Sequence, residues 1–327
     1  MDTKEQSIVN QSSPSGFLLM EFSEVRELQI LHFCMFLAFY LAALIGNILI
    51  ISAVAFDSHL QTPMYFFLIN LAIQDIGSVS VIMPKSMANT LLNIRYISYA
   101  GCVAQVFFFL FFLISDFFLL TVMAYDRYVA ICKPLQYEML MNMQACIQMV
   151  IRVWISSFLC GVLHTGCTFS SPLCSNVVNQ FFCEVPHLLK MACSDLYLFE
   201  IGAIVLGSVT VLGCFIFIIA TYVQIFTEVL KIPSAEGRQR AFSTCLPHLI
   251  VVSIFVFTGC FAYLKPTSNS PSHLDLAFTM IYSMVPPLMN PIIYSMRNKE
   301  VKNALSKLLG SRLSSMNAFS SFFFLQR

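Results

Sequence analysis

Charged residues are scarce in this chain. Only 11% of its 327 residues are Asp, Glu, Lys or Arg, whereas 58% are hydrophobic; soluble domains average about 25% charged residues. A soluble core of this size could not hide so much apolar surface, so we expect most of the chain to lie in lipid. The net charge of +1 gives no electrostatic reason to expect a nucleic-acid partner.

Several functional signatures are missing as well. The sequence has no H-E-x-x-H, no G-x-S-x-G and no clustered His at metal-ligand spacing, so we expect no enzyme activity, no metal centre and no cofactor. An internal repeat, typical of many transporters, is absent, which disfavours a transporter or channel. No basic segment precedes a short apolar stretch near the N-terminus, so we expect no cleavable signal peptide.

Long apolar runs are abundant. A helix needs roughly 20 apolar residues to cross a bilayer, and continuous runs favour helices over the alternating strands of a barrel. The sequence therefore predicts an all-α membrane protein, a seven-transmembrane helix bundle over 28–296, between an N-terminal segment 1–27 and a tail 297–327. The expected spans are 28–54, 62–88, 101–131, 144–169, 199–231, 240–264 and 274–296.

Basic residues predict the orientation of the bundle. Most Lys and Arg outside the spans fall on the side of the C-terminus, and basic loops usually stay in the cytoplasm. We therefore expect an extracellular N-terminus, a cytoplasmic C-terminus and a location in the plasma membrane. A glycosylation sequon at Asn10 agrees with this orientation. So do four cysteines on the oxidising side, where disulfides are allowed and three pairings are possible; they are Cys102, Cys174, Cys183 and Cys193.

Four polar side chains interrupt the apolar runs at similar depth. Asp75, Asp116, Asn47 and Asn290 each lie in a different predicted span. Charged groups at this depth are costly in lipid and usually face the interior of a bundle. They could form a hydrogen-bonded network that ties helices together, or an ion site that acts as a switch. Two acids at similar depth favour the ion site.

An acid and an arginine close the third apolar run. Asp126 and Arg127 stand in "MAYDRYVAICKPLQY", at the predicted cytoplasmic end of span three. We expect the Arg127 side chain to reach the interface and pair with Asp126. Because an ion pair of this kind is a poor source of stability, we interpret it as a contact that opens during function.

This segment resembles the signature of the odorant receptors, a branch of the rhodopsin-like G-protein-coupled receptors. Four further segments resemble the same family, and together the matches cover most of 20–312: "LQTPMYFFLINLAIQD", "FFCEVPHLLKMACSD", "RQRAFSTCLPHLIVV" and "PPLMNPIIYSMRNKEVKNAL". The resemblance implies a receptor for a small volatile odorant that activates a heterotrimeric G protein of the olfactory, stimulatory, cyclic-AMP-raising type. It also implies the disulfides Cys102–Cys183 and Cys174–Cys193.

The resemblance also implies roles for single residues. Arg127 would leave Asp126 on activation and contact the G protein. Asp75 and Asp116 would share a sodium ion that favours the resting receptor. The residues implied in coupling and activation are Asp126, Arg127, Tyr128, Tyr222, Asn290, Pro291 and Tyr294.

The ligand site is expected in the extracellular half of the bundle. Helical spacing places Val106, Phe109 and Leu113 on one stripe of span three. Such a stripe alone would be ordinary packing, but with the resemblance its upper part becomes the wall of a small apolar pocket. Related amine receptors carry an Asp where this chain has Phe109, so a neutral ligand is favoured over an amine. The expected lining is Phe109, Leu110, Leu113, Ile114, Leu206, Thr210, Val256, Gly259, Tyr263, Met280 and Ser283.

A short helix is expected after the seventh span. Apolar residues recur there at helical spacing, among several lysines. This pattern predicts an amphipathic helix that lies on the inner leaflet and contacts membrane lipid. The apolar residues are Val301, Ala304, Leu305 and Leu308, and the lysines are Lys299, Lys302 and Lys307.

Overall fold

A computed structural model describes most of the chain. It covers residues 16–20, 22–23, 25–170, 172–189, 191, 197–264, 273–297, 300–308 and 310. For 197–201, 240–241, 243–244, 247, 261–264, 273–277 and 293–297 it describes the backbone alone. The predictions made for Asn10, Cys193 and Lys299, and for the side chains of Tyr263 and Tyr294, lie outside the described residues and stay predictions.

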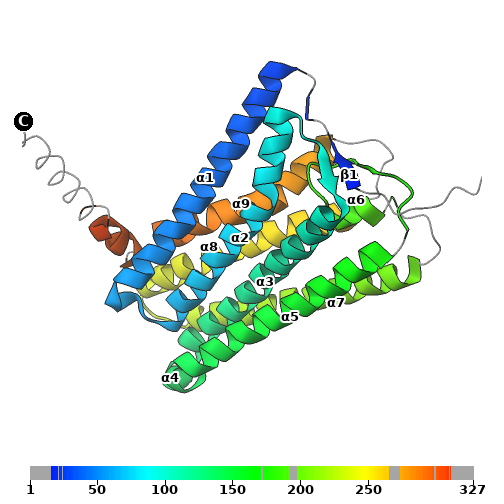
Figure 1. The fold of residues 1–327 in the computed structure, drawn as a ribbon. Coiled ribbons are helices and arrows are strands. Elements are labelled where there is room, and N and C mark those ends of the chain that lie inside the picture. Colours follow the sequence, from blue (N-terminus) through cyan, green and yellow to red (C-terminus); the bar gives the residue numbers. More distant parts are fainter. Residues whose placement is uncertain are drawn as a thin grey trace, which may run out of the picture.

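Seven long helices form the body of the molecule (Figure 1). Each overlaps one of the predicted spans, so the seven-helix prediction is confirmed. The helices are α1 (Arg26–Phe56), α2 (Pro63–Leu92), α3 (Tyr99–Cys132), α5 (Met143–Ser170), α7 (Tyr197–Leu230), α8 (Ala235–Leu264) and α9 (His273–Arg297). Among the described residues, α1, α2, α3, α5 and α7 are long and apolar enough to cross a membrane, and α8 has a shorter apolar stretch, His248–Cys260.

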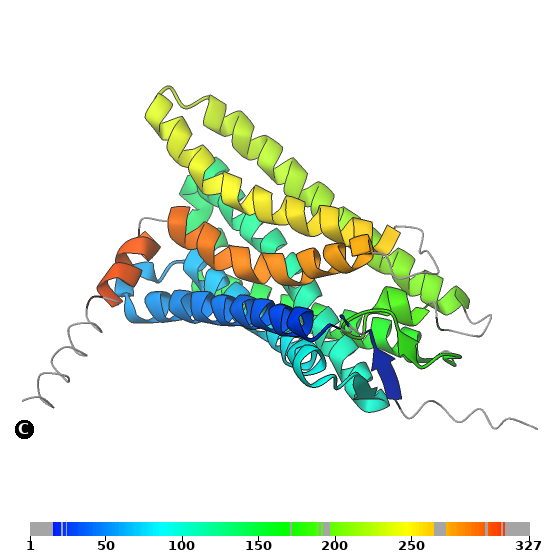
Figure 2. The same ribbon diagram turned by 90° about the horizontal axis from the view of Figure 1, so that it is seen from above.

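The helices pack around α3. This helix contacts α2, α5, α7 and α8, while α8 lies between α7 and α9 (Figure 2). Shorter elements connect the long ones: η1 (Ser58–Leu60), η2 (Pro134–Gln136), α4 (Tyr137–Leu140) and α6 (Val185–Leu189). Outward-facing side chains such as Val209 and Phe257 are apolar and largely exposed, which is the surface expected of a bundle whose solvent is lipid.

Local sequence explains where α2 and α3 begin and end. Pro63 occupies the first turn of α2, where its missing N–H would have no partner in any case. Asn93 ends the helix with a left-handed φ of 53°, a conformation that Asn tolerates at a helix C-terminus. The Ser98 hydroxyl accepts a hydrogen bond from the Gly101 N–H at 3.1 Å and caps the start of α3.

A small sheet joins the N-terminal segment to two loops, and the sequence analysis did not predict it. Its strands are β1 (Gly16–Leu19), β2 (Tyr96–Ser98) and β3 (Val177–Val178), in the order β2-β1-β3. Strand β1 pairs antiparallel with β2 and parallel with β3. A Cβ at Gly16 would lie 2.4 Å from the Ile97 carbonyl oxygen, so this close pairing requires glycine.

The bundle has two chemically different ends. The sheet, α6 and the Cys102–Cys183 disulfide lie at one end, which we call the disulfide end. Helix α4 lies at the other end (Figure 1). It follows η2 and the last turns of α3, which carry Arg127, and we call this the arginine end.

The predicted helix after the seventh span is present at the arginine end. Residues 300–308 are helical and lie beside the end of α1 (Figure 1). Val301 and Ala304 are buried against the main apolar core. Tyr65 of α2 donates a hydrogen bond to the Glu300 carboxylate at 2.6 Å, and the Lys307 Nζ lies 3.5 Å from an Asp57 carboxylate oxygen. Its contact with a membrane leaflet remains a prediction.

Candidate ligand and coupling sites

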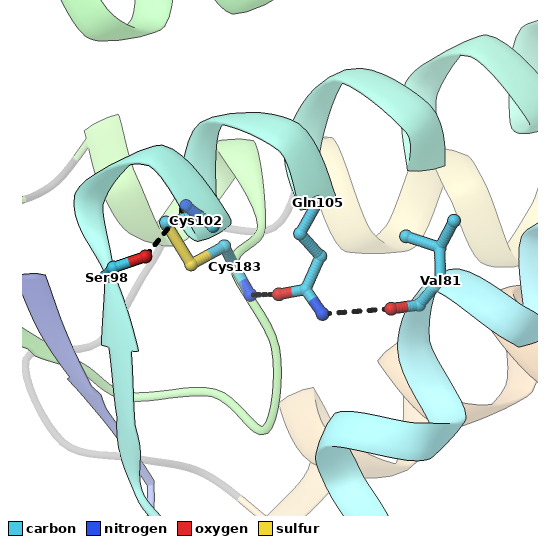
Figure 3. Close-up of a disulfide and its surroundings, with 6 residues drawn as sticks. Val81, Ser98, Cys102, Gln105 and Cys183 are labelled. Carbon is cyan, nitrogen blue, oxygen red and sulfur yellow. Dashed lines mark hydrogen bonds between the residues drawn. A yellow bond between two sulfur atoms is a disulfide. The ribbon is translucent and has the colours of Figure 1, made fainter.

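The loop between α5 and α7 is tied to the bundle beside the disulfide. Cys183 is bonded to Cys102 at the start of α3, which confirms this pairing. The Gln105 side chain adds two hydrogen bonds (Figure 3): its Oε1 accepts from the Cys183 N–H at 2.9 Å, and its Nε2 donates to the Val81 carbonyl at 3.1 Å. The loop is therefore fixed to both α3 and α2. Cys174 is also disulfide-bonded, and its pairing with Cys193 stays a prediction.

Two phenylalanines carry this loop into the helix bundle. Phe181 and Phe182 are fully buried. The Phe182 ring lies edge-on to Phe109 of α3, with 5.1 Å between centroids, and Phe109 lies 6.1 Å from the Tyr282 ring of α9. Aromatic rings at these separations attract each other beyond their burial. The upper part of the predicted α3 stripe thus faces an aromatic cluster built from the loop and α9.

Polar groups of the loop also reach α9. The Gln180 Nε2 donates to the Thr279 Oγ1 at 3.0 Å, and the Tyr282 hydroxyl donates to the Glu184 Oε1. Glu184 is only 2% exposed. The loop therefore brings a carboxylate to the side of the aromatic cluster.

Open space lies beside α8 at Gly259. Phe255 of α8 stacks on Phe117 of α3 at 5.4 Å, so this face of α8 points into the bundle. Gly259 follows Phe255 by one helical turn and lies on the same face. A Cβ added at Gly259 would meet no atom within 4 Å, so a ligand could occupy the space beside it.

The mid-span polar residues only partly form a network. Asp75 is fully buried, and the Asn290 Nδ2 donates to both of its carboxylate oxygens at 3.1 Å. Asn47 Nδ2 donates to the Ala43 and Pro287 carbonyls, each at 3.0 Å. These contacts tie α1, α2 and α9 together. Among the residues that the structure describes, Asp116 makes no such contact, so a purely structural network leaves it unexplained.

Buried oxygens without hydrogen-bond donors remain at this depth. They are Asp116 Oδ1, Ser115 Oγ, Asn290 Oδ1 and Asn47 Oδ1. Oxygen atoms are the ligands that hard cations prefer, so these atoms are of the chemical type that a sodium ion would require. Among the described residues, no group of three or more His, Cys, Asp or Glu is placed to hold a metal ion.

The prediction that Asp126 and Arg127 form an ion pair is wrong. Asp126 accepts a hydrogen bond from the Tyr137 hydroxyl at 2.9 Å, and the Arg127 guanidinium donates to the sulfur of Met64 on α2. No ion pair joins Asp126 to Arg127 among the described residues. The physical reason is helical geometry, because adjacent residues of a helix do not face each other. Burial, and then the Asp126 carboxylate, raise the pKa of the Tyr137 phenol, which stays protonated and able to donate.

A second contact closes the arginine end. The buried His248 of α8 lies with its Nε2 2.9 Å from the Leu120 carbonyl of α3, and its ring stacks on Tyr222 of α7 at 5.6 Å. Three helices therefore meet at one imidazole. Tyr128, predicted to take part in coupling, lies nearby under the Lys133 ammonium, 5.6 Å from the ring centroid.

Comparison with known proteins fits this arrangement. A family model described as olfactory receptor matches residues 33–312. The chain is 49% identical to olfactory receptor 14I1 of Homo sapiens, over 91% of this chain and 96% of that protein. The chain belongs to the olfactory receptor family. The receptor is also 48% identical to human olfactory receptor 14J1, over 92% and 94% of the two chains, and 43% identical to olfactory receptor 1G1 of Gorilla gorilla gorilla, over 93% and 97%.

Membership of this family settles the broad class of the receptor. Olfactory receptors are seven-helix receptors and not enzymes, and the family implies odorant sensing through a G protein. The predicted fold class and the predicted absence of enzyme activity are therefore confirmed.

The predicted ligand residues of the receptor divide into two groups. Most face the bundle: Phe109, Leu110 and Ser283 are buried, and Leu113, Ile114, Val256, Gly259 and Met280 are partly buried. Leu206 is 56% exposed, and the Thr210 hydroxyl donates to the Leu206 carbonyl within α7. Thr210, one helical turn after Leu206, is partly buried. The place of both residues in the pocket wall stays a prediction.

Sequence reasoning missed the residues that the loop contributes. Phe182 and the α9 residue Tyr282 lie against Phe109, and they contact Phe181 and Glu184 in turn. None of these four residues was predicted to line the site. One available signal was the segment "FFCE", because a cysteine bonded to the start of α3 must hold its neighbours against that helix.

Proposed function

We propose that the receptor binds a small, neutral, volatile odorant and activates a stimulatory G protein that raises cyclic AMP. The observation that carries the ligand class is the environment of Phe109. This side chain is buried against Phe182 and Tyr282, where an amine receptor of related fold would have its Asp. Aromatic rings and the open space beside Gly259 favour an apolar molecule.

The receptor is proposed to lie in the plasma membrane with its disulfide end outside the cell. Two observations support this orientation. Cys102–Cys183 is a disulfide, and Cys174 is disulfide-bonded as well, and such bonds persist in oxidising surroundings. The arginine end then faces the cytoplasm and the G protein, with the helix 300–308 against lipid. Glycosylation of Asn10 belongs to the same proposal.

Activation is proposed to open the arginine end. The contacts of Tyr137 with Asp126, and of His248 with Leu120, hold α3 and α8 in the described arrangement. An odorant shifts the equilibrium if it binds the open form more tightly than the closed form. Arg127 would then leave Met64 and contact the G protein. The remaining coupling residues stay as proposed: Tyr128, Tyr222 and Tyr294 near the opening, and Asn290 and Pro291 as a hinge.

A sodium ion is proposed to stabilise the closed form. Asp75 and Asp116 would hold the ion. Ser115 and Asn290 lie at about the same depth in the bundle, and each has a buried oxygen without a hydrogen-bond donor that could bind the ion as well. Raising sodium should then oppose agonists, and Asp116→Asn should weaken this antagonism. Equal sodium sensitivity in the wild type, Asp75→Asn and Asp116→Asn would show that the two acids are only structural.

A panel of neutral odorants on cells that express the receptor tests the proposed function. We expect cyclic AMP to rise at micromolar or higher concentrations, which corresponds to about −8 kcal/mol or weaker binding. Gly259→Phe should block the response by filling the open space. Gly213→Phe is the matched control, because a Cβ at Gly213 also meets no atom within 4 Å but this residue of α7 is exposed.

Two results would contradict the proposal. In one, only permanently charged compounds activate the receptor. In the other, both glycine variants respond like the wild type, which would place the ligand elsewhere.

A further inference from the structure

Glu184 is a buried acid that the proposed activation does not use. It follows Cys183 in the loop, and its side chain is almost inaccessible to solvent. Its Oε1 accepts the Tyr282 hydroxyl, and the Tyr282 ring lies 6.1 Å from Phe109. The carboxylate therefore borders the aromatic cluster of the proposed ligand site.

The second oxygen of this carboxylate lacks a hydrogen bond. Oε2 is buried without a donor. The Nδ1 of His187 lies 3.3 Å from Oε2 and would form an ion pair with it only if the imidazole were protonated. Neither atom has a hydrogen-bond partner among the described residues. A buried acceptor without a donor is costly, and such groups in native proteins usually have a partner.

A purely structural role for Glu184 would explain the hydrogen bond at Oε1 but not the burial of Oε2. The bond from Tyr282 to Oε1 joins the loop to α9, and a neutral Gln could make it equally well through its own oxygen. Oε2 adds nothing to that bond. A group that is present only when a ligand is bound would supply the missing donor.

We propose that Glu184 is a specificity-determining residue of the ligand site and that Oε2 accepts a hydrogen bond from a ligand O–H group. The inference rests on the proposed ligand site and narrows its chemistry. Among neutral odorants of equal size, alcohols bind more tightly than ethers or ketones, which have no proton to donate.

Isomeric and isosteric probes test this preference in the wild-type receptor. The probes are n-octanol, its isomer methyl heptyl ether, hexyl methyl ketone, and homologues of each with longer and shorter chains. Hydrogen bonds to charged groups are worth enough to change affinity about tenfold or more. We expect each alcohol to activate at a concentration about tenfold or more below that of its isomeric ether. Equal potency within these pairs would overturn the proposal.

The Glu184→Gln variant sharpens the test. Its amide oxygen can keep the bond from Tyr282, while its NH2 group replaces Oε2 by a donor. The NH2 group can donate to the ketone oxygen. The potency of the ketone relative to that of the alcohol should therefore be about tenfold or more higher in Glu184→Gln than in the wild type. An unchanged ratio at matched surface expression would overturn the proposal.

His187→Ala is the matched control. It removes the ring beside Oε2 but leaves the carboxylate, so the preference for alcohols should remain. Loss of the preference in this variant, with Glu184 intact, would show that His187 and not Glu184 selects the ligand.

Two further outcomes are distinguishable. If Glu184→Gln does not reach the cell surface, the wild-type alcohol and ether pairs decide the matter. A receptor that responds to no neutral odorant contradicts the proposed function and this inference with it, whereas a response to ketones, ethers and alcohols alike contradicts the inference alone.

Discussion

The disulfide end and the arginine end are held together by different kinds of bond. At the disulfide end, β1 pairs with strands from two loops, a covalent bond joins Cys102 to Cys183, and Phe181 and Phe182 fill the space between helices. At the arginine end, single side-chain contacts such as Tyr137–Asp126 and His248–Leu120 join neighbouring helices.

This difference matches two functional requirements. A ligand site gains affinity when it is formed before the ligand arrives, because less ordering is needed on binding. A coupling surface must instead change shape, and a net hydrogen bond of about 0.5–1.5 kcal/mol is weak enough for ligand binding to overcome. The loss of a bond at the disulfide end should therefore abolish folding, whereas a loss at the arginine end should change signalling in a folded receptor.

Removing the Cys102–Cys183 disulfide should reduce the amount of folded receptor more than any substitution at the arginine end. Cys183→Ser frees the loop that carries Phe182 and Glu184, and native disulfides typically contribute about 2–5 kcal/mol. We expect little receptor at the cell surface, measured by antibody staining of an epitope tag. Cys34→Ser is the control, since Cys34 is exposed and unpaired and should be delivered normally. Normal surface staining and odorant response in Cys183→Ser would show that this end is not held by its covalent bond.

Arg127→Ala should abolish signalling without loss of the receptor. The guanidinium contacts only the Met64 sulfur among the described hydrogen bonds, so little stability depends on it. Met64→Leu removes this acceptor at nearly the same volume and should cost less than about 1.5 kcal/mol. We expect cyclic AMP to stay at the basal level in Arg127→Ala and to respond in Met64→Leu, at equal surface staining. An odorant response in Arg127→Ala would exclude this residue from coupling.

Tyr137→Phe should increase signalling, whereas Arg127→Ala should abolish it, and the size of the change should be intermediate. It deletes the hydrogen bond to Asp126 while the ring remains. If the bond favours the closed form, its loss of about 0.5–1.5 kcal/mol should raise the open population up to about tenfold. Basal cyclic AMP should therefore rise without odorant. A basal level equal to that of the wild type would mean that the bond is equally strong in both forms.

The sequence could predict the helices because most of the apolar runs are long enough to span a bilayer on their own. Contacts between elements were harder to predict. Asp126 and Arg127 are neighbours in the sequence but do not face each other on the helix surface. The position of Phe182 depends on the bond of its neighbour Cys183 to Cys102 and on α9, and both Cys102 and α9 are far from Phe182 in the sequence. The short strand β1 has no repeating pattern long enough to predict it.

The smallest effect is expected from the ion pair between Lys307 and Asp57. It joins the helix 300–308 to the end of α1 across 3.5 Å, but the lysine side chain is 72% exposed, and exposed pairs often contribute nothing measurable because water and salt screen them. Tyr65→Phe, by contrast, removes a partly buried bond to Glu300 in the same helix. At equal surface staining, we therefore expect odorant potency to be unchanged in Lys307→Ala and to fall about tenfold or more in Tyr65→Phe, since a bond to a carboxylate is worth about 1.5–3 kcal/mol. If the lysine variant has the larger effect, charge and not the buried bond holds this helix, and the arginine end would be more sensitive to salt than its other contacts indicate.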